Sequence, residues 1–191
     1  QPRSTVDLKL CEQMRRLPRC AGHGCSGMRN EYLSSLVRVD NREHAVEATE
    51  WFGNAWVRGT LPAWFVSTYM GTRIAPLIKA PPAPGEVPDC RPVAVGECLR
   101  RLVTTAVVRK FKNSFGTILW PQQVSTGIPS GATILTTGVR EILRLHPEFA
   151  VVKVDIENAY NCCTRASMIA AIGRHETLAP LAAMYGATLG V

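Results

Sequence analysis

The sequence lacks any long uninterrupted hydrophobic segment. None of its apolar runs reaches the roughly 18 residues needed to cross a bilayer, and the longest are broken by charged residues such as Glu97, Arg100 and Arg101. The chain does not open on a basic and then apolar leader, so secretion is not indicated. We therefore expect an intracellular protein, in the nucleus or the cytoplasm, without a membrane partner.

Acidic residues are scarce. The 191 residues include 15 Asp and Glu against 22 Lys and Arg, which gives a formal net charge of +7. Hydrophobic residues make up 46% and charged residues 19%, a balance typical of globular proteins. A chain of this length can bury a core without disulfides, and an odd number of cysteines, seven, favours free intracellular thiols.

Several motifs of common enzyme classes and metal sites are missing. No Gly-x-Ser-x-Gly elbow supports a serine hydrolase, and no glycine-rich lysine loop supports a nucleotide-binding P-loop. Cys11, Cys20, His23 and Cys25 raise the hypothesis of a small zinc-bound interaction module. Since the spacing from Cys20 to Cys25 has no matching second half, we favour free thiols in a loop.

The two ends of the sequence are unusual. Residue 1 is Gln, and the apolar stretch over 178–191 stops without a polar tail. Natural termini usually extend into solvent. We therefore expect an internal fragment of a longer protein.

Hydrophobic periodicity and turn residues predict helices that alternate with short extended segments. Helical spacing of apolar residues predicts helices over 28–37, 43–58, 96–112 and 132–145. Extended segments over 73–79 and 91–95 flank four prolines in 80–89, which form either a domain linker or the loop of a hairpin. Thr164 is a suitable cap for a helix over 165–173.

Residues 149–156 form an apolar run that is broken only by Lys153 and Asp155. This run predicts a strand that is buried mostly on both faces. A carboxylate at the end of a strand is held at the rim of the sheet, where Mg²⁺ reaches it together with substrate phosphates. Taken alone, Asp155 is better explained as an ordinary acid at a strand end or turn, and only the neighbouring residues favour the metal-ligand interpretation.

Asp155 lies within the string Val151-Val152-Lys153-Val154-Asp155-Ile156-Glu157-Asn158-Ala159-Tyr160-Asn161. This string resembles motif A of reverse transcriptases, especially those of non-LTR retrotransposons. Four other blocks resemble the same family in the same order, so that the resemblance covers about residues 24–186. These blocks are Gly24 to Leu33, Leu61-Pro62 through Pro76-Leu77-Ile78-Lys79, Arg91-Pro92-Val93-Ala94 with Leu99 to Leu102, and Gln122-Gln123 with Gly127 and Gly131-Ala132.

The resemblance implies an α+β fold, an incomplete right-hand polymerase. Residues 1–60 would form a helical N-terminal extension, and residues 61–148 a fingers-like region with a hairpin and helices. Residues 149–191 would be the first strand and helix of the palm, and Cys162 and Cys163 are expected to fill the palm core.

The implied activity is that of an RNA-directed DNA polymerase, which transfers deoxynucleotides to a primer by a two-metal mechanism. Its partners would be an RNA template, a DNA primer and deoxynucleoside triphosphates, and the complete enzyme would hold two Mg²⁺ ions. A Gln-Gly-x-x-x-Gly block and an aromatic-x-Asp-Asp hairpin are absent from these residues, so we expect the chain alone to be inactive. The alternative is a degenerate or domesticated remnant that binds nucleic acid without catalysis.

The resemblance assigns roles to the residues of motif A. Asp155 would be the catalytic metal ligand, and the backbone carbonyl of Ile156 a further ligand. Asn158 and Ala159 would donate backbone N–H groups to the triphosphate. Tyr160 would be the steric gate beneath the sugar, although retrotransposon members more often have Phe there. The other interpretation of Tyr160 is a core aromatic with its hydroxyl at the surface.

Basic residues elsewhere would bind phosphate. The resemblance implies that Lys79 and Arg91 grip the triphosphate, Lys as a point charge and Arg as a planar fork; for Lys79 a solvated strand end is an equal alternative. A basic helix face suits template phosphates, with contacts that depend on salt and not on base sequence. The alternative is that this face is an ordinary solvated helix surface. The residues of the face are Arg100, Arg101, Arg109, Lys110 and Lys112.

Overall fold

A computed structural model describes residues 7–38, 43–78, 80–156 and 159–189. Its contacts divide the chain into two compact units. The first unit, here the N-terminal unit, contains the chain up to Val107 together with the segment from Ala183. The second unit contains Val108–Ala182. The three functional regions expected from the resemblance stay predictions, because this division by packing does not test them.

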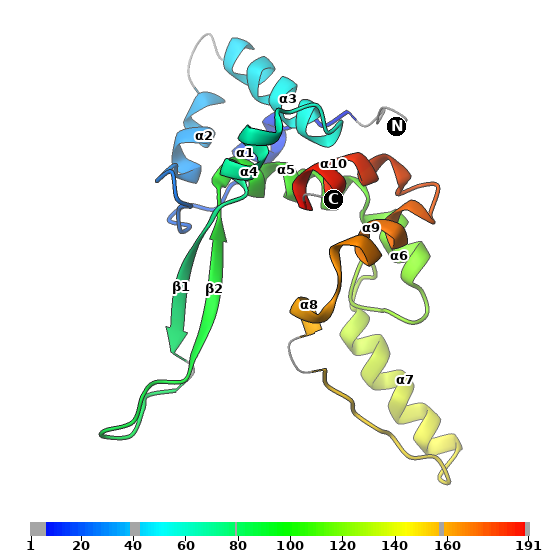
Figure 1. The fold of residues 1–191 in the computed structure, drawn as a ribbon. Coiled ribbons are helices and arrows are strands. Elements are labelled where there is room, and N and C mark those ends of the chain that lie inside the picture. Colours follow the sequence, from blue (N-terminus) through cyan, green and yellow to red (C-terminus); the bar gives the residue numbers. More distant parts are fainter. Residues whose placement is uncertain (1–6, 39–42, 79, 157–158, 190–191) are drawn as a thin grey trace. The chain divides into compact units, whose positions relative to one another are not determined.

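The N-terminal unit is mostly helical, with one hairpin. A short helix precedes two longer ones, and a fourth leads into the two strands (Figure 1). The fifth begins directly after the second strand and runs into the second unit. In chain order the elements are α1 (Cys11–Arg15), α2 (Asn30–Leu36), α3 (Glu43–Val57), α4 (Ala63–Tyr69), β1 (Thr72–Ile78), β2 (Cys90–Gly96), α5 (Cys98–Lys110) and, near the end of the chain, α10 (Ala182–Leu189).

The core of the N-terminal unit forms around α5. Its buried positions recur at helical spacing, with Leu102 and Val103 fully buried. Leu10 and Met14 of the N-terminal segment are also fully buried. Trp56 of α3 is 2% exposed and donates its indole N–H to the hydroxyl of Thr188 in α10 at 3.1 Å. Segments from both ends of the chain therefore close this core.

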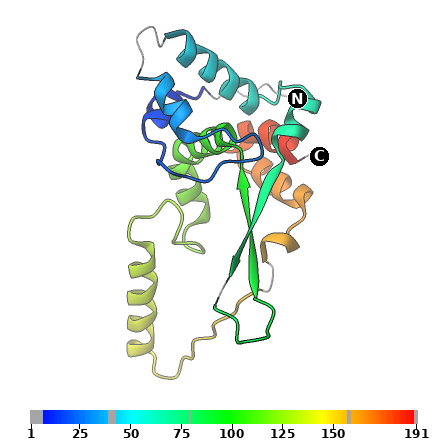
Figure 2. The same cartoon turned by 90° about the vertical axis from the view of Figure 1, so that its left-hand side faces the viewer.

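The two strands confirm the predicted hairpin. β1 and β2 pair in antiparallel register from Thr72 opposite Gly96 to Ile78 opposite Cys90, and they twist about each other (Figure 2). The proline-rich segment that follows β1 is the loop of this hairpin and not a domain linker. Pro76 lies opposite Pro92. Since neither has an N–H, this pair must occupy a position without mutual hydrogen bonds.

The second unit contains four α-helices and one short 3₁₀ helix among its described residues. They are α6 (Lys112–Leu119), α7 (Gly131–Leu145), α8 (Ala159–Cys162), α9 (Arg165–Gly173) and the 3₁₀ helix η1 (Ala179–Leu181). The predicted cap of α9 is confirmed, because the Thr164 hydroxyl accepts a hydrogen bond from the Ser167 N–H at 3.2 Å.

The predicted helices are confirmed to within about two residues at most of their ends. They correspond to α2, α3, α5, α7 and α9. The mixed α+β composition is also confirmed, with one two-stranded antiparallel sheet in the described residues. The sequence did not predict α6. Within the described residues, no helix is long and apolar enough to cross a membrane.

The prediction of a strand over 149–156 is wrong for this structure. The segment has no regular secondary structure, and Val152 and Val154 are 81% and 79% exposed (Figure 1). A buried strand needs neighbours on its edges and faces. In the described residues the two strands β1 and β2 pair only with each other, so this segment has no ladder to join.

The prediction that two cysteines fill a core beside this segment is also wrong here. Cys162 and Cys163 are both exposed. Apolar residues of the helix before the segment are open as well, with Leu135 55% and Leu145 62% exposed on α7. The exposed cysteines and the exposed apolar residues of α7 have the same cause, because a core forms only where a second layer packs against the first.

Candidate functional site

Asp155 lies near the end of the open segment over 149–156. Its side chain is exposed and makes no hydrogen bond or ion pair with another described residue. The next residue, Ile156, is 67% exposed. The carboxylate is thus accessible to a cation, and it is not buried in apolar packing.

Part of the remaining motif lies outside the described residues. This holds for Glu157 and for Asn158, which was expected to bind triphosphate. Ala159 is exposed and begins α8. The backbone of Tyr160 belongs to α8, but its side chain is outside the described part. The triphosphate contacts and the steric gate therefore stay predictions.

The described residues do not complete a metal site. They bring no three His, Cys, Asp or Glu side chains together as ligands. Asp155 supplies one carboxylate, which suits Mg²⁺ only together with phosphate oxygens or a further acid. The described residues alone therefore do not complete a site for two Mg²⁺ ions. The zinc hypothesis gains no support, since Cys20 and Cys25 are exposed free thiols.

One face of the hairpin carries Arg91. Arg91 pairs with Leu77 across the ladder and is exposed. Because side chains alternate along a strand, Arg91 shares its face with Val93 and with Arg73 on the neighbouring strand. Lys79, its expected companion, lies outside the described residues. An exposed guanidinium on a two-stranded arm is available to an anion.

A buried carboxylate fixes the base of this hairpin. Glu97, between β2 and α5, is 3% exposed. It accepts hydrogen bonds from the Ser26 N–H at 2.8 Å and from the Ser26 hydroxyl at 2.6 Å. A Cβ at Gly24 would lie 2.6 Å from the carboxyl carbon of Glu97, so this close approach requires glycine. The glycine-rich loop over 20–27 is thus attached where the strands meet α5.

Two further arginines hold the same loop. Arg73 Nε donates to the carbonyl of His23 at 3.3 Å. Arg101 Nη2 donates to the carbonyl of Gly22 at 2.8 Å and to Asn30 Oδ1 at 3.4 Å. The loop is therefore held by backbone carbonyls as well as by Ser26.

Two of the five arginines and lysines predicted to bind nucleic acid act within the fold. Arg101 is one of them. Arg100 Nη1 donates to the carbonyl of Met70 at 3.2 Å, and burial lowers the pKa of Arg100. A guanidinium has five donors, so a phosphate contact by either residue stays a prediction.

The other three basic residues are exposed and belong to the second unit. They are Arg109, Lys110 and Lys112. The stretch between Glu97 and Glu141 contains no acidic residue and has six basic ones. These six are Arg100, Arg101, Arg109, Lys110, Lys112 and Arg140. This stretch of sequence is therefore positively charged overall, with five of its six basic residues between positions 100 and 112.

No protein-family model, no curated protein and no solved structure matches this chain. The candidate site is therefore supported by its own residues and their geometry.

Sequence reasoning missed the structural role of Glu97. It is separated from Ser26 by 71 residues, and no local pattern predicts such a contact. The sequence feature that pointed to a special role for Glu97 was its position as a single acid within a basic segment. Sequence reasoning also missed Asn113 and Trp120, which line a pocket in the second unit. Their spacing of seven residues, from the start of α6 to the residue after it, was the signal.

Proposed function

We propose that this chain is the fingers region and the beginning of the palm of a reverse transcriptase similar to those of non-LTR retrotransposons. The reaction is template-directed transfer of deoxynucleotides to a DNA primer on an RNA template. This function requires the finer fold of an incomplete right-hand polymerase, in which residues 149–156 become the first palm strand. The string over 151–161, with its exposed Asp155, is the observation that carries the proposal.

The hairpin supports this proposal. An antiparallel arm occurs between the two blocks where the family has its fingers strands, and Arg91 is exposed on it. A planar guanidinium binds two phosphate oxygens at once. Arg91 would therefore hold the triphosphate of an incoming nucleotide.

The chemistry requires more than these residues. Two bound Mg²⁺ ions would stabilise the charge on the attacking and leaving oxygens. Asp155 contributes one carboxylate toward such ions. The proposed function therefore requires a further acidic motif beyond these residues, and the chain alone is expected to be inactive.

Primer extension tests the proposal. The protein is the product of the complete reading frame that contains this chain, assayed with an RNA template and a DNA primer. Asp155→Asn keeps the shape of the side chain and removes its charge. We expect extension to fall about a hundredfold or more, because metal stabilisation is worth several kcal/mol.

Glu176→Gln is the matched control. Glu176 is another exposed carboxylate of the second unit, and no role is assigned to it. This variant should extend the primer at the original rate. An Asp155→Asn protein that extends the primer as fast as Glu176→Gln would refute the proposed function.

A second function, nucleic-acid binding without catalysis, is favoured by the acid-free basic stretch between Glu97 and Glu141. It predicts a stop codon soon after the codon for Val191. It also predicts salt-dependent binding of nucleic acid by a protein that does not extend a primer although Asp155 is intact. An open frame that encodes an Asp-Asp hairpin supports the polymerase instead.

A further inference from the structure

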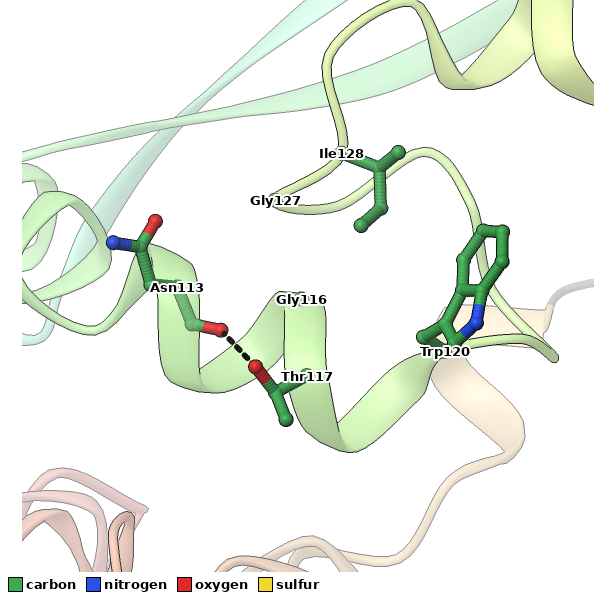
Figure 3. A pocket seen from close by; sticks show the side chains of 6 residues that line it. All are labelled: Asn113, Gly116, Thr117, Trp120, Gly127 and Ile128. Carbon is green, nitrogen blue, oxygen red and sulfur yellow. Dashed lines mark hydrogen bonds between the residues drawn. The ribbon is translucent and has the colours of Figure 1, made fainter.

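A pocket of about 400 Å³ lies within residues 113–128 of the second unit. Its size falls within the range of ligand sites in proteins. Four of its six lining residues come from α6 and the residue that follows the helix (Figure 3). They recur at i, i+3, i+4 and i+7 and so share one helix face. The lining residues are Asn113, Gly116, Thr117, Trp120, Gly127 and Ile128.

Two glycines create this pocket. The loop after α6 returns across the helix, so that Gly127 lies against Gly116. A Cβ at Gly127 would lie 2.7 Å from the Cα of Gly116 and 2.7 Å from the carbonyl oxygen of Lys112. The φ of Gly127 is +79°, which other residues rarely adopt. The crossing is therefore tight, and it fixes the loop that carries Ile128.

The side chains around this crossing suit a planar, partly polar ligand. The Trp120 ring stands at one end of the pocket and is 50% exposed, while Asn113 stands at the other end (Figure 3). The Thr117 hydroxyl donates to the Asn113 carbonyl at 3.1 Å. The side-chain amide of Asn113 makes no hydrogen bond to another described residue, so its donors and its acceptor are available.

The positive charge beside the pocket favours a ligand that carries a negative charge. Lys112 directly precedes Asn113 and is exposed, as are Arg109 and Lys110. The sequence between Glu97 and Glu141 contains no carboxylate. A planar ring joined to a negative charge is the chemistry of a nucleotide. Aromatic side chains next to cations are typical of sites for single strands, whose bases are free to stack.

We propose that this pocket takes one unpaired base of a single-stranded nucleic acid. The base stacks on Trp120 at one end of the pocket, and at the other end the Asn113 amide and Lys112 contact the next part of the same strand. The site is separate from Asp155 and needs no metal. It rests on the nucleic-acid partner of the proposed function and not on its chemistry.

Binding of a fluorescein-labelled twelve-nucleotide single-stranded RNA to the 191-residue chain tests this site by anisotropy. Trp120→Ala should weaken binding about tenfold, because it removes the stacking of one base on one aromatic ring. Trp120→Phe keeps an aromatic ring and should retain most of the affinity. Trp51→Ala is the matched control, since Trp51 is 69% exposed on α3 of the N-terminal unit. It should bind like the unchanged chain.

Salt dependence separates the two parts of the site. Lys112→Ala should lower the slope of log K against log salt by about one, whereas Trp120→Ala should leave the slope unchanged. Asn113→Ala should weaken binding by a smaller factor than Trp120→Ala. Circular dichroism checks that each variant is folded.

Three results would overturn the proposal. One is Trp120→Ala binding within twofold of Trp51→Ala. Another is that Trp120→Ala weakens binding of duplex RNA of the same length as much as it weakens binding of the single strand, since a paired base does not enter the pocket. The third is competition by a free nucleoside monophosphate at the same nucleotide concentration, which would make a free nucleotide the ligand. Glu176→Gln should bind RNA normally, and because this assay needs neither metal nor primer extension, failure here is distinguishable from failure of the polymerase proposal.

Discussion

The N-terminal unit and the open part of the second unit differ in how far they bury apolar side chains. In the N-terminal unit, Leu102, Val103 and Val107 of α5 have no exposed surface. In the second unit, the apolar face of α7 and the segment over 149–156 are exposed, up to 81% at Val152. Apolar side chains are therefore enclosed by neighbouring elements in the first region and lack such neighbours among the described residues in the second.

Charged groups show the same difference. The N-terminal unit buries Glu97 with two hydrogen bonds from Ser26, which offset the cost of removing a carboxylate from water. Asp155 in the second unit is exposed and has no such partners among the described residues. The first carboxylate is therefore structural, and the second is free to bind a ligand.

The largest expected effect compares the same substitution in two helices. Leu102→Ala should lower the free energy of unfolding by about 2–5 kcal/mol, because it leaves a cavity in a closed core. Leu135→Ala on α7 should change it by less than about 0.5 kcal/mol, since that side chain is 55% exposed. Urea unfolding of both variants measures the difference. Equal losses would show that α7 is packed.

The second prediction concerns the attachment of the glycine-rich loop. Glu97→Gln should cost about 1–3 kcal/mol of stability, because the charge that strengthens both bonds from Ser26 is lost. Combined with Ser26→Ala, the two losses should not add, since they remove one contact. Glu47→Gln, an exposed acid on α3, is the control and should be neutral. Additive losses in urea unfolding would mean that the two residues act independently.

How far the sequence predicts the structure depends on the range of the contacts. Local patterns predicted α3, α7, α9 with its Thr164 cap, and the hairpin, because each is specified within a few neighbouring turns. The strand predicted over 149–156 does not form, because an apolar run does not reveal whether a partner strand is available to pair with it. The placement of Cys162 and Cys163 failed for the same reason.

The candidate site shows the same limit. Asp155 and Arg91 are both exposed, and their roles stay predictions. The roles of Arg100 and Arg101 as donors to Met70 and Gly22 depend on contacts across 30 and 79 residues, and periodicity does not reveal them. A basic residue on a helix face is predictable from spacing, whereas its partner is not.

The smallest expected effect is a change in pH dependence. The Cys20 N–H donates to Glu31 Oε1 at 2.6 Å, and this bond lowers the pKa of Glu31 below 4.5, with help from Arg29 and Arg19. A lowered folded-state pKa stabilises the fold above the unfolded value and loses that contribution as pH falls through the folded value. Stability should therefore decline below pH 4.5.

Glu31→Gln should reduce this acid dependence. Urea midpoints from neutral pH down to acid measure it, with Glu86→Gln, an exposed acid of the hairpin loop, as the control. A Glu31→Gln protein with the same acid decline as Glu86→Gln would mean that the bond from Cys20 contributes nothing.

Hydrogen exchange at the amides of 151–156 tests the central claim most directly. The proposed function requires this segment, which is irregular here, to become a palm strand that places Asp155 at a catalytic rim when it pairs with further strands. The account predicts fast exchange in the 191-residue chain and strong protection in the product of the complete reading frame. Fast exchange of these amides in both proteins would contradict it.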